Sequence, residues 1–466
     1  MRTKYLLIAI VSLSAVLGGG TFAHASTKDK INIYVNEAVE QSKIPGIEMT
    51  VIQDGVLKPS KSYGNLKADN IMPIGSISKP LTSYAIMKLV EGNKLKLDDK
   101  LSSYISELNL THEGSKSDVT VRQLLNHTSG LSTAEGRRLI GTNDNSVYRH
   151  AMRLSNAQLM HQPGTTFEYS NANYAILGAL IEKVSNQSYA DFMHKNVFMP
   201  LGMYSTSADV SVTQSTNFTS GYQSWFGFNV PSTIKYNPGG APYGYVASTA
   251  HDLGTFLIAQ LNTSDKLIRE TQESSTVIDQ ASKTYYGLGW VLREQEGRNI
   301  ILHAGDNADY SSFMQLDLNK GNGVVVMINR NHYLEPTYSI DIGLGILNII
   351  NNGKSGGIGE SGGMIRLIGA FVVLLSIALL VFYAAKPTYR GKKRKALIIL
   401  AVIFCFVALL LPVTLLKLIE ATLMVAFMNA PDVTIAVLFL ELLLVVFVLL
   451  VSFYEYRFKM LSIKNR

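Results

Sequence analysis

Residues 73–80 read PIGSISKP and place a serine and a lysine three positions apart, just where a helical pattern begins. Apolar residues then recur every three to four positions, as on one face of a helix: Leu81, Tyr84, Ala85, Met87 and Leu89. On such a helix Lys79 lies one turn along from Ser76, so its amine can reach the serine hydroxyl. The stretch is compatible with a helix cap at Ser76 or with a serine nucleophile that an amine activates.

The two ends of the 466-residue chain differ in character from its middle. Residues 1–25 carry two basic residues, then an apolar run, then Ala23-His24-Ala25, an order typical of a cleaved secretory signal peptide. Residues 351–363 read NNGKSGGIGESGG, which is the composition of a flexible linker with few contacts across it. The sequence therefore predicts one folded domain over residues 26–350, outside the cytoplasm.

Three apolar runs follow the linker, and each is long enough to cross a hydrocarbon layer about 30 Å thick as a helix: residues 367–384, 396–416 and 433–454. Basic residues lie between the first two runs and again after the third, so we expect both segments in the cytoplasm. The sequence thus predicts three transmembrane helices over residues 364–456, a cytoplasmic tail at 457–466, and a multi-pass cell-membrane protein whose main domain faces outward.

Composition excludes several classes of protein. The single cysteine, Cys405, rules out a disulfide-stapled scaffold. The nine histidines form no ligand motif such as His-Glu-x-x-His, and we expect neither a metal nor another cofactor. The net charge of +7 comes largely from the basic segments beside the apolar runs, so no nucleic-acid partner is expected. Glu441, inside the third run, either marks a functional path or bonds to a neighbouring helix.

The order of strand and helix patterns predicts an α+β fold. Residues 46–64 form a hairpin pattern around the turn pair Asp54-Gly55, and four strand patterns lie near the other end of the domain: residues 286–292, 300–303, 312–318 and 323–329. Helical patterns lie between, as at residues 121–127 and 174–185. We expect an antiparallel sheet of the terminal strands, flanked by helices and carrying an all-α subdomain, with Ser76 at the cleft between them.

Two distant stretches bear on Ser76. They are Tyr169-Ser170-Asn171 in PGTTFEYSNANY and His303-Ala304-Gly305 in ILHAGDNADYSS. Each alone has an ordinary explanation, a helix cap in the first and a buried histidine at a strand end in the second. Together with Ser76-x-x-Lys79, in this order, they resemble the motifs of the penicillin-recognising serine hydrolases of the class C β-lactamase and D-Ala-D-Ala carboxypeptidase type. The resemblance extends through most of residues 30–350, in TVRQLLNHTSGL (120–131), PLGM (200–203) and YGLGW (286–290).

The resemblance implies a catalytic role for three side chains. Ser76 would attack a carbonyl carbon, while Lys79 and Tyr169 would share removal of its proton, the lysine ammonium favouring phenolate character in Tyr169. The backbone N–H groups of Ser76 and Asp306 would form the oxyanion hole. The implied reaction forms an acyl-enzyme and then hydrolyses it, on a small peptide or β-lactam substrate.

The resemblance also implies a substrate-binding role for Asn171, His303 and Gly305, with departures from the family pattern. His303 stands where many relatives carry lysine, which weakens a fixed positive charge for a substrate carboxylate near neutral pH. Asp309 stands where relatives often carry glycine; it either adds a carboxylate at the pocket or caps a turn. Both departures weaken the expectation of strong β-lactamase activity.

Three functions remain open at this stage. The first is a hydrolase of D-amino-acid peptides or β-lactams. The second is a maturation peptidase that removes an acyl-D-amino-acid group from a secreted peptide natural product, since some such family members resemble this chain in having an outer catalytic domain followed by three membrane spans. The third is a non-catalytic penicillin-binding sensor, which the intact set of motifs disfavours. The sequence leaves the natural substrate and the oligomeric state open.

Overall fold

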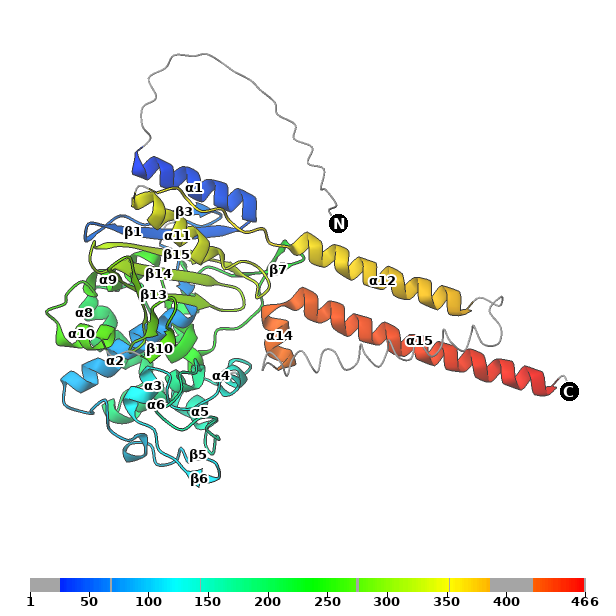
Figure 1. The fold of residues 1–466 in the computed structure, drawn as a ribbon, viewed down its shortest axis with the longest axis horizontal. Helices are drawn as coiled ribbons and strands as arrows, with labels where there is room; N and C mark the ends of the chain where they lie inside the picture. The colour runs from blue at the N-terminus through cyan, green and yellow to red at the C-terminus, as the bar shows by residue number, and fades with distance from the viewer. Residues whose placement is uncertain are drawn as a thin grey trace, which may run out of the picture.

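A computed structural model describes residues 26–67, 69–142, 144–273, 276–351, 353–385 and 422–464. Within these residues, an antiparallel sheet with the order β10-β11-β12-β13-β14-β15-β1-β2, and with β3 also paired to β1, forms the centre of the domain (Figure 1). The strands are β1 (Gly46–Gln53), β2 (Val56–Leu57), β3 (Lys61–Gly64), β10 (Thr276–Asp279), β11 (Thr284–Tyr286), β12 (Val291–Gln295), β13 (Arg298–Asp306), β14 (Ser311–Asp317) and β15 (Asn322–Ile328). Since β1 pairs with β15, the predicted sheet of terminal strands is confirmed.

The predicted turns and strands hold with one exception. Asp54 and Gly55 both adopt positive φ, 51° and 75°, as a two-residue turn between β1 and β2 requires. The prediction of one strand over residues 286–292 is wrong. Gly289 has φ of 90° and the Gly287 N–H donates to the Trp290 carbonyl, so this stretch is the turn that separates β11 from β12.

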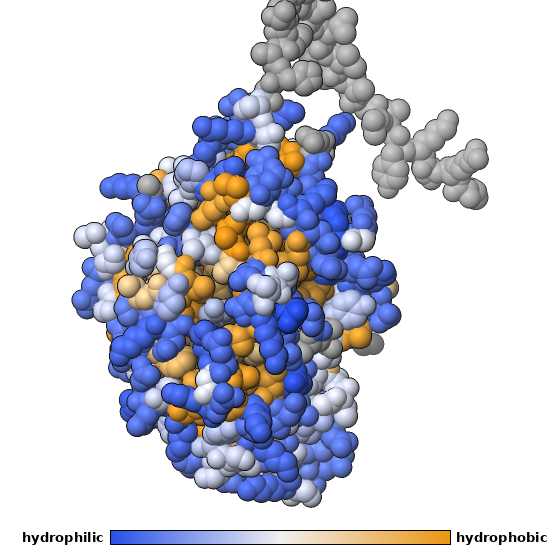
Figure 2. Space-filling view, turned by 90° about the vertical axis from the view of Figure 1, so that its left-hand side faces the viewer, coloured by the Kyte–Doolittle hydropathy of each residue, from blue (hydrophilic) through white to orange (hydrophobic). Residues whose placement is uncertain are grey.

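Helices cover both faces of the sheet (Figure 1). On one face, α1 (Thr27–Ser42) and α11 (Tyr338–Ile350) pack on Val324 and Val326 of β15. On the other face, α2 (Ser78–Glu91) and α9 (Ala250–Ala259) belong to the core that contains Val325 and Met327. Successive side chains of a strand point to opposite faces, so one apolar strand supplies both cores. On the side of the molecule away from α12 and α15, hydrophobic side chains gather in the middle of a largely hydrophilic surface (Figure 2).

The expected all-α subdomain lies beside the sheet, as α3 (Val121–Leu125), α4 (Thr133–Ile140), α5 (Val147–Met152), α6 (Asn171–Ser185) and α7 (Tyr189–Met193). Helix α6 begins three residues before the predicted start, because the Ser170 side chain caps it by accepting from the Ala172 N–H. The remaining elements are β4 (Met72–Pro73), β5 (Thr111–His112), β6 (Ser115–Lys116), β7 (Tyr222–Trp225), β8 (Phe228–Pro231), β9 (Ala247–Ser248), β16 (Arg330–Asn331), α8 (Met199–Leu201), α10 (Lys266–Glu273) and the short turns η1 (Gly75–Ile77), η2 (Leu101–Ser103), η3 (His194–Phe198), η4 (Val210–Gln214), η5 (Pro238–Gly240) and η6 (Ala241–Tyr245).

Three further helices follow the domain: α12 (Gly363–Ala385), α14 (Leu423–Asn429) and α15 (Pro431–Lys464). Helices α12 and α15 lie side by side and extend away from the sheet (Figure 1). The first and third predicted spans fall on α12 and α15, and the second, residues 396–416, lies outside the described residues. In the part of the chain that the structure describes, no helix combines the length and the apolar character needed to cross a membrane, so the three predicted transmembrane helices are not confirmed.

A buried charge cluster joins the C-terminal helices to the domain. Arg366 of α12 donates to Glu335 at 2.8 Å and to Asp432, next to the start of α15, at 3.0 Å. Asp432 also contacts His332 at 2.8 Å, and Arg330 pairs with Glu335. The expectation of few contacts across the linker is therefore wrong. The linker residues themselves form no helix or strand over 353–362, but the helices beyond them return and pack on the domain.

Asp432 supplies the test of this cluster. Burial alone would raise the pKa of its carboxyl, but hydrogen bonds from His332, the Phe226 N–H and Arg366 hold that pKa at about 2. Removing one partner of a buried ion pair costs about 3–5 kcal/mol. We therefore expect Asp432→Asn to loosen α12 and α15 from the domain, measured as faster proteolytic cleavage within residues 353–362 of the full-length chain.

Glu441→Gln, a loss of the same charge further along α15, is the matched control and should leave cleavage unchanged. Because the pKa of Asp432 is lowered on folding, its contribution is complete above about pH 4, the ordinary value, and is lost as the pH falls toward about 2. Equal cleavage of Asp432→Asn and wild type at neutral pH would show that the cluster does not hold the helices.

Candidate active site

Ser76 lies in the single turn η1, immediately before helix α2. Its side chain caps neither element, so the cap interpretation of PIGSISKP is wrong. Gly75 has φ of 54°, and a Cβ atom there would lie 2.4 Å from the backbone nitrogen of Asp306, so only glycine fits before the serine. Ser78 is fully buried and its hydroxyl donates to the Gly75 carbonyl, whereas Ser76 is partly exposed.

The amine of Lys79 is the centre of the site. Its Nζ lies 2.8 Å from Ser76 Oγ, 2.8 Å from Asn171 Oδ1 and 2.9 Å from the Tyr243 carbonyl oxygen. The side chain is completely buried, and burial lowers the pKa of the amine well below its usual range. The first residue of α6, a carbonyl of turn η6 and the serine of turn η1 thus all contact one nitrogen atom of α2.

Tyr169 completes the group around Ser76. The Ser76 side chain lowers the pKa of the Tyr169 phenol, and the Lys79 amine lies 4.8 Å from the centre of its ring. Burial raises the pKa of Tyr169 above its usual range, and this effect is larger than the lowering by the Ser76 side chain. The expected phenolate character is therefore not supported: the two pKa shifts favour a neutral phenol beside a neutral amine.

His127, to which sequence analysis gave no role, supports the loop that carries Tyr169. Its Nδ1 accepts from the Ser170 N–H at 3.2 Å and from the Asn173 amide at 2.9 Å, and its carbonyl accepts from the Glu168 N–H. The imidazole ring lies 4.4 Å from the Tyr169 ring, centre to centre. His127 falls within TVRQLLNHTSGL, so the motif was visible but the contact across the fold was not.

Strand β13 forms the opposite wall. A Cβ atom on Gly305 would lie 2.0 Å from the Ile74 carbonyl oxygen and 2.5 Å from Ser312 Oγ, so the missing side chain lets β13 approach the turn before Ser76. The Asp306 nitrogen consequently lies beside Gly75. This arrangement fits the expected pair of oxyanion donors, the N–H groups of Ser76 and Asp306.

His303 does not face the substrate space as expected. It is buried, its Nδ1–H donates to the Ala304 carbonyl, and its Nε2 accepts from the Tyr286 hydroxyl at 3.2 Å. Burial, together with the nearby Lys79, lowers the pKa of His303 to about 3. The imidazole is therefore neutral near pH 7 and packs behind Tyr169, with ring centres 6.4 Å apart.

Ser76 opens into the middle of a row of three cavities. The central one, of about 50 Å³, is lined by Ser76, Asn171 and Asp306, among others. On one side it shares Tyr245 and Asn307 with a cavity of about 390 Å³. That cavity is bordered by Asp309, whose pKa burial raises to about 6. The carboxylate therefore lies at the neighbouring cavity and not in the lining of the pocket that contains Ser76.

On the other side the central cavity shares Ile140, Asp306 and Asn429 with a cavity of about 510 Å³. Asn429 and its neighbour Met428 belong to α14, far from Ser76 in sequence. Residues 422–430 carry no motif, and sequence analysis gave them no part in the site. Only the return of the C-terminal segment to the domain places them there. Among the described residues no group of three or more candidate metal ligands lies together.

Comparison with known proteins agrees with this geometry. The family described as Beta-lactamase matches residues 31–341, which include each of the predicted site residues. The chain belongs to the beta-lactamase family.

Two curated relatives have the same degree of identity. Protein flp of Staphylococcus aureus (strain MRSA252) is 28% identical over 323 residues, which cover 66% of this chain and 64% of that protein. Penicillin-binding protein 4* of Bacillus subtilis (strain 168) is 28% identical over 300 residues, which cover 59% of this chain and 64% of that protein. The chain thus spans slightly less than two thirds of the length of these relatives.

Two solved structures are similar. The octameric penicillin-binding protein homologue from Pyrococcus abyssi has a TM-score of 0.61 and 25% identity, and the match covers 73% of this chain and 81% of that one. A D-stereospecific amidohydrolase from Streptomyces sp. has a TM-score of 0.54 and 23% identity, covering 64% and 93%, and it supports the fold alone. The α+β fold of this family of serine hydrolases is therefore confirmed.

Gly305 provides a test of the beta-lactamase-family geometry. Gly305→Ala should push β13 away from the turn before Ser76 and displace one oxyanion donor, the Asp306 N–H. Loss of one such donor lowers kcat by about 10²–10³-fold. Acylation by a chromogenic ester measures the loss. Gly92→Ala, at the end of α2, meets nothing closer than 3.5 Å and is the control. Near-normal acylation in Gly305→Ala, with the fold retained, would contradict the role of β13 in placing an oxyanion donor beside Ser76.

Tyr169 provides a second test. Tyr169→Phe keeps the ring against His127 and removes the hydroxyl expected to share the Ser76 proton, so acylation should slow by about 10²–10⁴, the usual contribution of a proton-transfer group. We expect the acylation rate to rise with pH as Lys79 loses its proton, at a pH below the usual range for lysine. This rise should persist in Tyr169→Phe, because it reports the titration of Lys79 and not of Tyr169.

The control is Tyr148→Phe, which removes a phenol bonded to Glu107 on the subdomain surface. Stopped-flow acylation of the three proteins across pH gives the comparison. A Tyr169→Phe rate within about threefold of wild type would exclude Tyr169 from proton transfer.

Proposed function

We propose that this protein is a serine hydrolase that cleaves amide bonds of D-amino-acid-containing peptides or β-lactams through an acyl-enzyme on Ser76. The observation that carries the proposal is the position of Lys79 Nζ, shared at hydrogen-bond distance by Ser76, Asn171 and the Tyr243 carbonyl.

The partners of Lys79 suit a general base. A neutral amine has two N–H donors and one lone pair, whereas Asn171 Oδ1 and the Tyr243 carbonyl oxygen can only accept. These two acceptors engage both N–H groups, so the lone pair is left facing the hydroxyl of Ser76. The lowered pKa of Lys79 keeps the amine neutral more readily near pH 7, which is the state that a base needs.

The reaction follows from these positions. The Ser76 oxygen attacks the amide carbon as the hydroxyl proton passes to Lys79. The negatively charged oxygen of the tetrahedral intermediate then accepts hydrogen bonds from the backbone N–H groups of Ser76 and Asp306. The departing amine takes a proton from Tyr169 or Lys79, which leaves the acyl group on Ser76. Water then attacks the acyl carbon and gives a proton to Lys79 or Tyr169. The bond between the acyl carbon and the Ser76 oxygen breaks, the serine hydroxyl is reprotonated, and the carboxylic acid is released.

We also propose that residues 26–350 act outside the cytoplasm and are held at a lipid bilayer by residues 364–456. The support lies in the signal-like residues 1–25 and in the apolar runs with basic flanks. Large apolar side chains on α12 and α15 are exposed, for example Phe371, Leu442 and Leu449, a distribution that suits contact with lipid better than with water.

Activity-based labelling tests the proposed nucleophile. A fluorescent penicillin and a fluorophosphonate should label the wild-type chain, and Ser76→Ala should abolish both labels without loss of fold, because one partly exposed hydroxyl adds little to stability. Ser78→Ala is the matched control for the neighbouring serine. N-acetyl-D-alanine p-nitroanilide should be hydrolysed faster than its L-enantiomer.

The outcomes separate the functions. Labelling that survives in Ser76→Ala would place the nucleophile elsewhere. Stoichiometric labelling by penicillin with no turnover of the ester or of either anilide would favour a penicillin-binding sensor. Turnover without preference for the D-enantiomer would keep the serine hydrolase and remove the proposed substrate class.

A further inference from the structure

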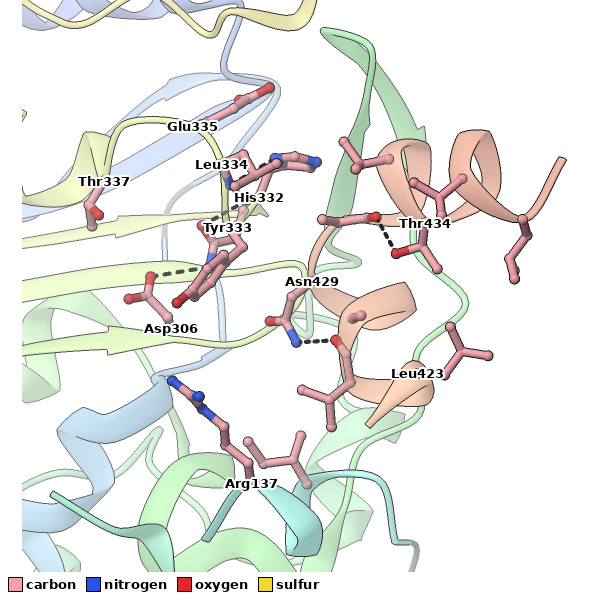
Figure 3. Close-up of a pocket in the computed structure, with 18 residues that line it drawn as sticks. Arg137, Asp306, His332, Tyr333, Leu334, Glu335, Thr337, Leu423, Asn429 and Thr434 are labelled. Carbon is pink, nitrogen blue, oxygen red and sulfur yellow. Dashed lines mark hydrogen bonds between the residues drawn. The ribbon is translucent and has the colours of Figure 1, made fainter. Parts of the chain in front are cut away.

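The largest of the three cavities has an apolar lining that the proposed reaction does not use. It has a volume of about 510 Å³, within the range of roughly 300–1,000 Å³ that small-molecule sites occupy. Figure 3 shows Tyr333 and Leu334, Leu423 and Arg137 around it. Its apolar wall is built by residues from α14, α15 and the segment after β16: Leu334, Leu423, Val425, Ala426, Val437 and Leu438.

Several of these side chains are exposed although they line a hollow. Leu334 is 53% exposed, Leu423 48% and Leu438 40%. Single exposed apolar residues are common on proteins, but a group of them around one concave space marks a binding site. Such a lining favours a ligand that is itself apolar.

Several polar groups around the cavity are already engaged. The Asn429 amide donates to the Val425 carbonyl at 2.7 Å, and the Thr434 hydroxyl donates to the Ala430 carbonyl at 2.9 Å (Figure 3). The Glu335 carboxylate is paired with Arg330 and Arg366. A polar ligand would find few free partners on this wall, whereas an alkyl chain needs none.

The cavity adjoins the one that Ser76 lines. Asp306 and Asn429 line both this cavity and the central one that contains Ser76, and Asp306 supplies one of the expected oxyanion donors. A molecule whose carbonyl lies at Ser76 can therefore extend an apolar chain past Asn429 into the space between α14 and α15.

We propose that this cavity is a substrate subsite that binds an unbranched alkyl chain, so that the preferred substrate is an amide carrying a fatty-acyl or similar chain. The inference rests on the proposed function, since it adds a chain-binding site to the same nucleophile. The C-terminal segment thus has a second role besides attachment, because α14 forms part of the wall. The buried pairs of His332 and Arg366 with Asp432 hold that wall in position.

The test uses inactivation of the full-length chain in lipid nanodiscs by a series of P-alkyl fluorophosphonates with methyl, hexyl, decyl and tetradecyl chains. In each, the Ser76 oxygen forms a bond to phosphorus, fluoride leaves, and the proton passes to Lys79, so the reaction does not depend on recognition of an amino acid. The second-order rate constant should rise with chain length, by about fourfold for each methylene that is buried.

Two variants narrow the cavity from different helices, Ala426→Phe in α14 and Val437→Phe in α15. In each, the ratio of decyl to methyl rate constants should fall by about tenfold or more. Val446→Phe, also on α15 but beyond the cavity and 43% exposed, should keep the wild-type ratio and controls for partitioning of long chains into lipid.

Three results would overturn the subsite. They are equal rate constants for methyl and decyl probes in wild type, a chain-length dependence that neither cavity variant reduces, and the same reduction in Val446→Phe. The first would also be the result if a lipid tail or a second copy of the chain occupied the cavity. In all three cases Ser76-dependent inactivation by the methyl probe would leave the proposed function standing. Absence of inactivation by any probe would remove the proposed function and the subsite together.

Discussion

The burial of one amine, Lys79 Nζ, is the constraint on which the rest of the cleft depends. A buried ammonium without partners is costly, and the chain meets this cost with three oxygen atoms and a lowered pKa. The partners come from the turn before α2, the start of α6 and turn η6, which are remote in sequence. The sheet, the subdomain and the η6 turn must therefore pack together before all three oxygen atoms reach the amine. The same packing thus stabilises the fold and forms the site.

Close backbone approach is the second requirement, and it explains two glycines. Gly75 and Gly305 face each other where the turn before Ser76 meets β13, and a Cβ atom on either would overlap the backbone of the other segment. The approach brings the Asp306 nitrogen beside the serine turn. His303 on this strand is buried and its pKa is lowered to about 3, so its imidazole supplies no fixed cation near pH 7.

The C-terminal helices are joined to this site physically. Arg366 and Asp432 form a buried network with His332 and Glu335, and the same segment places Asn429 in the lining of the pocket that contains Ser76. Helix α14, which the sequence analysis gave only to the membrane region, thus also lines the pocket that contains Ser76. Helices α12 and α15 contact the segment after β16 through Glu335 and His332, and Asn331 of β16 donates to the Asp306 carboxylate and to the Asn307 carbonyl. The C-terminal helices and the pocket that Ser76 lines are neighbours in the structure.

The sequence by itself determined what local patterns encode: the antiparallel strands, the turn at Asp54-Gly55, the helices of the subdomain, and the set of side chains from Ser76 to Gly305 that the family motifs carry. The apolar pattern at residues 286–292 wrongly predicted one strand, because glycines form a turn within it. Tertiary structure alone decided the contact of Lys79 with the Tyr243 carbonyl, the support of Tyr169 by His127, the inward packing of His303 and the place of α14 beside Ser76. A backbone carbonyl has no residue-type signal, and a contact between distant segments depends on the path of the whole chain, so neither can be read from a local pattern.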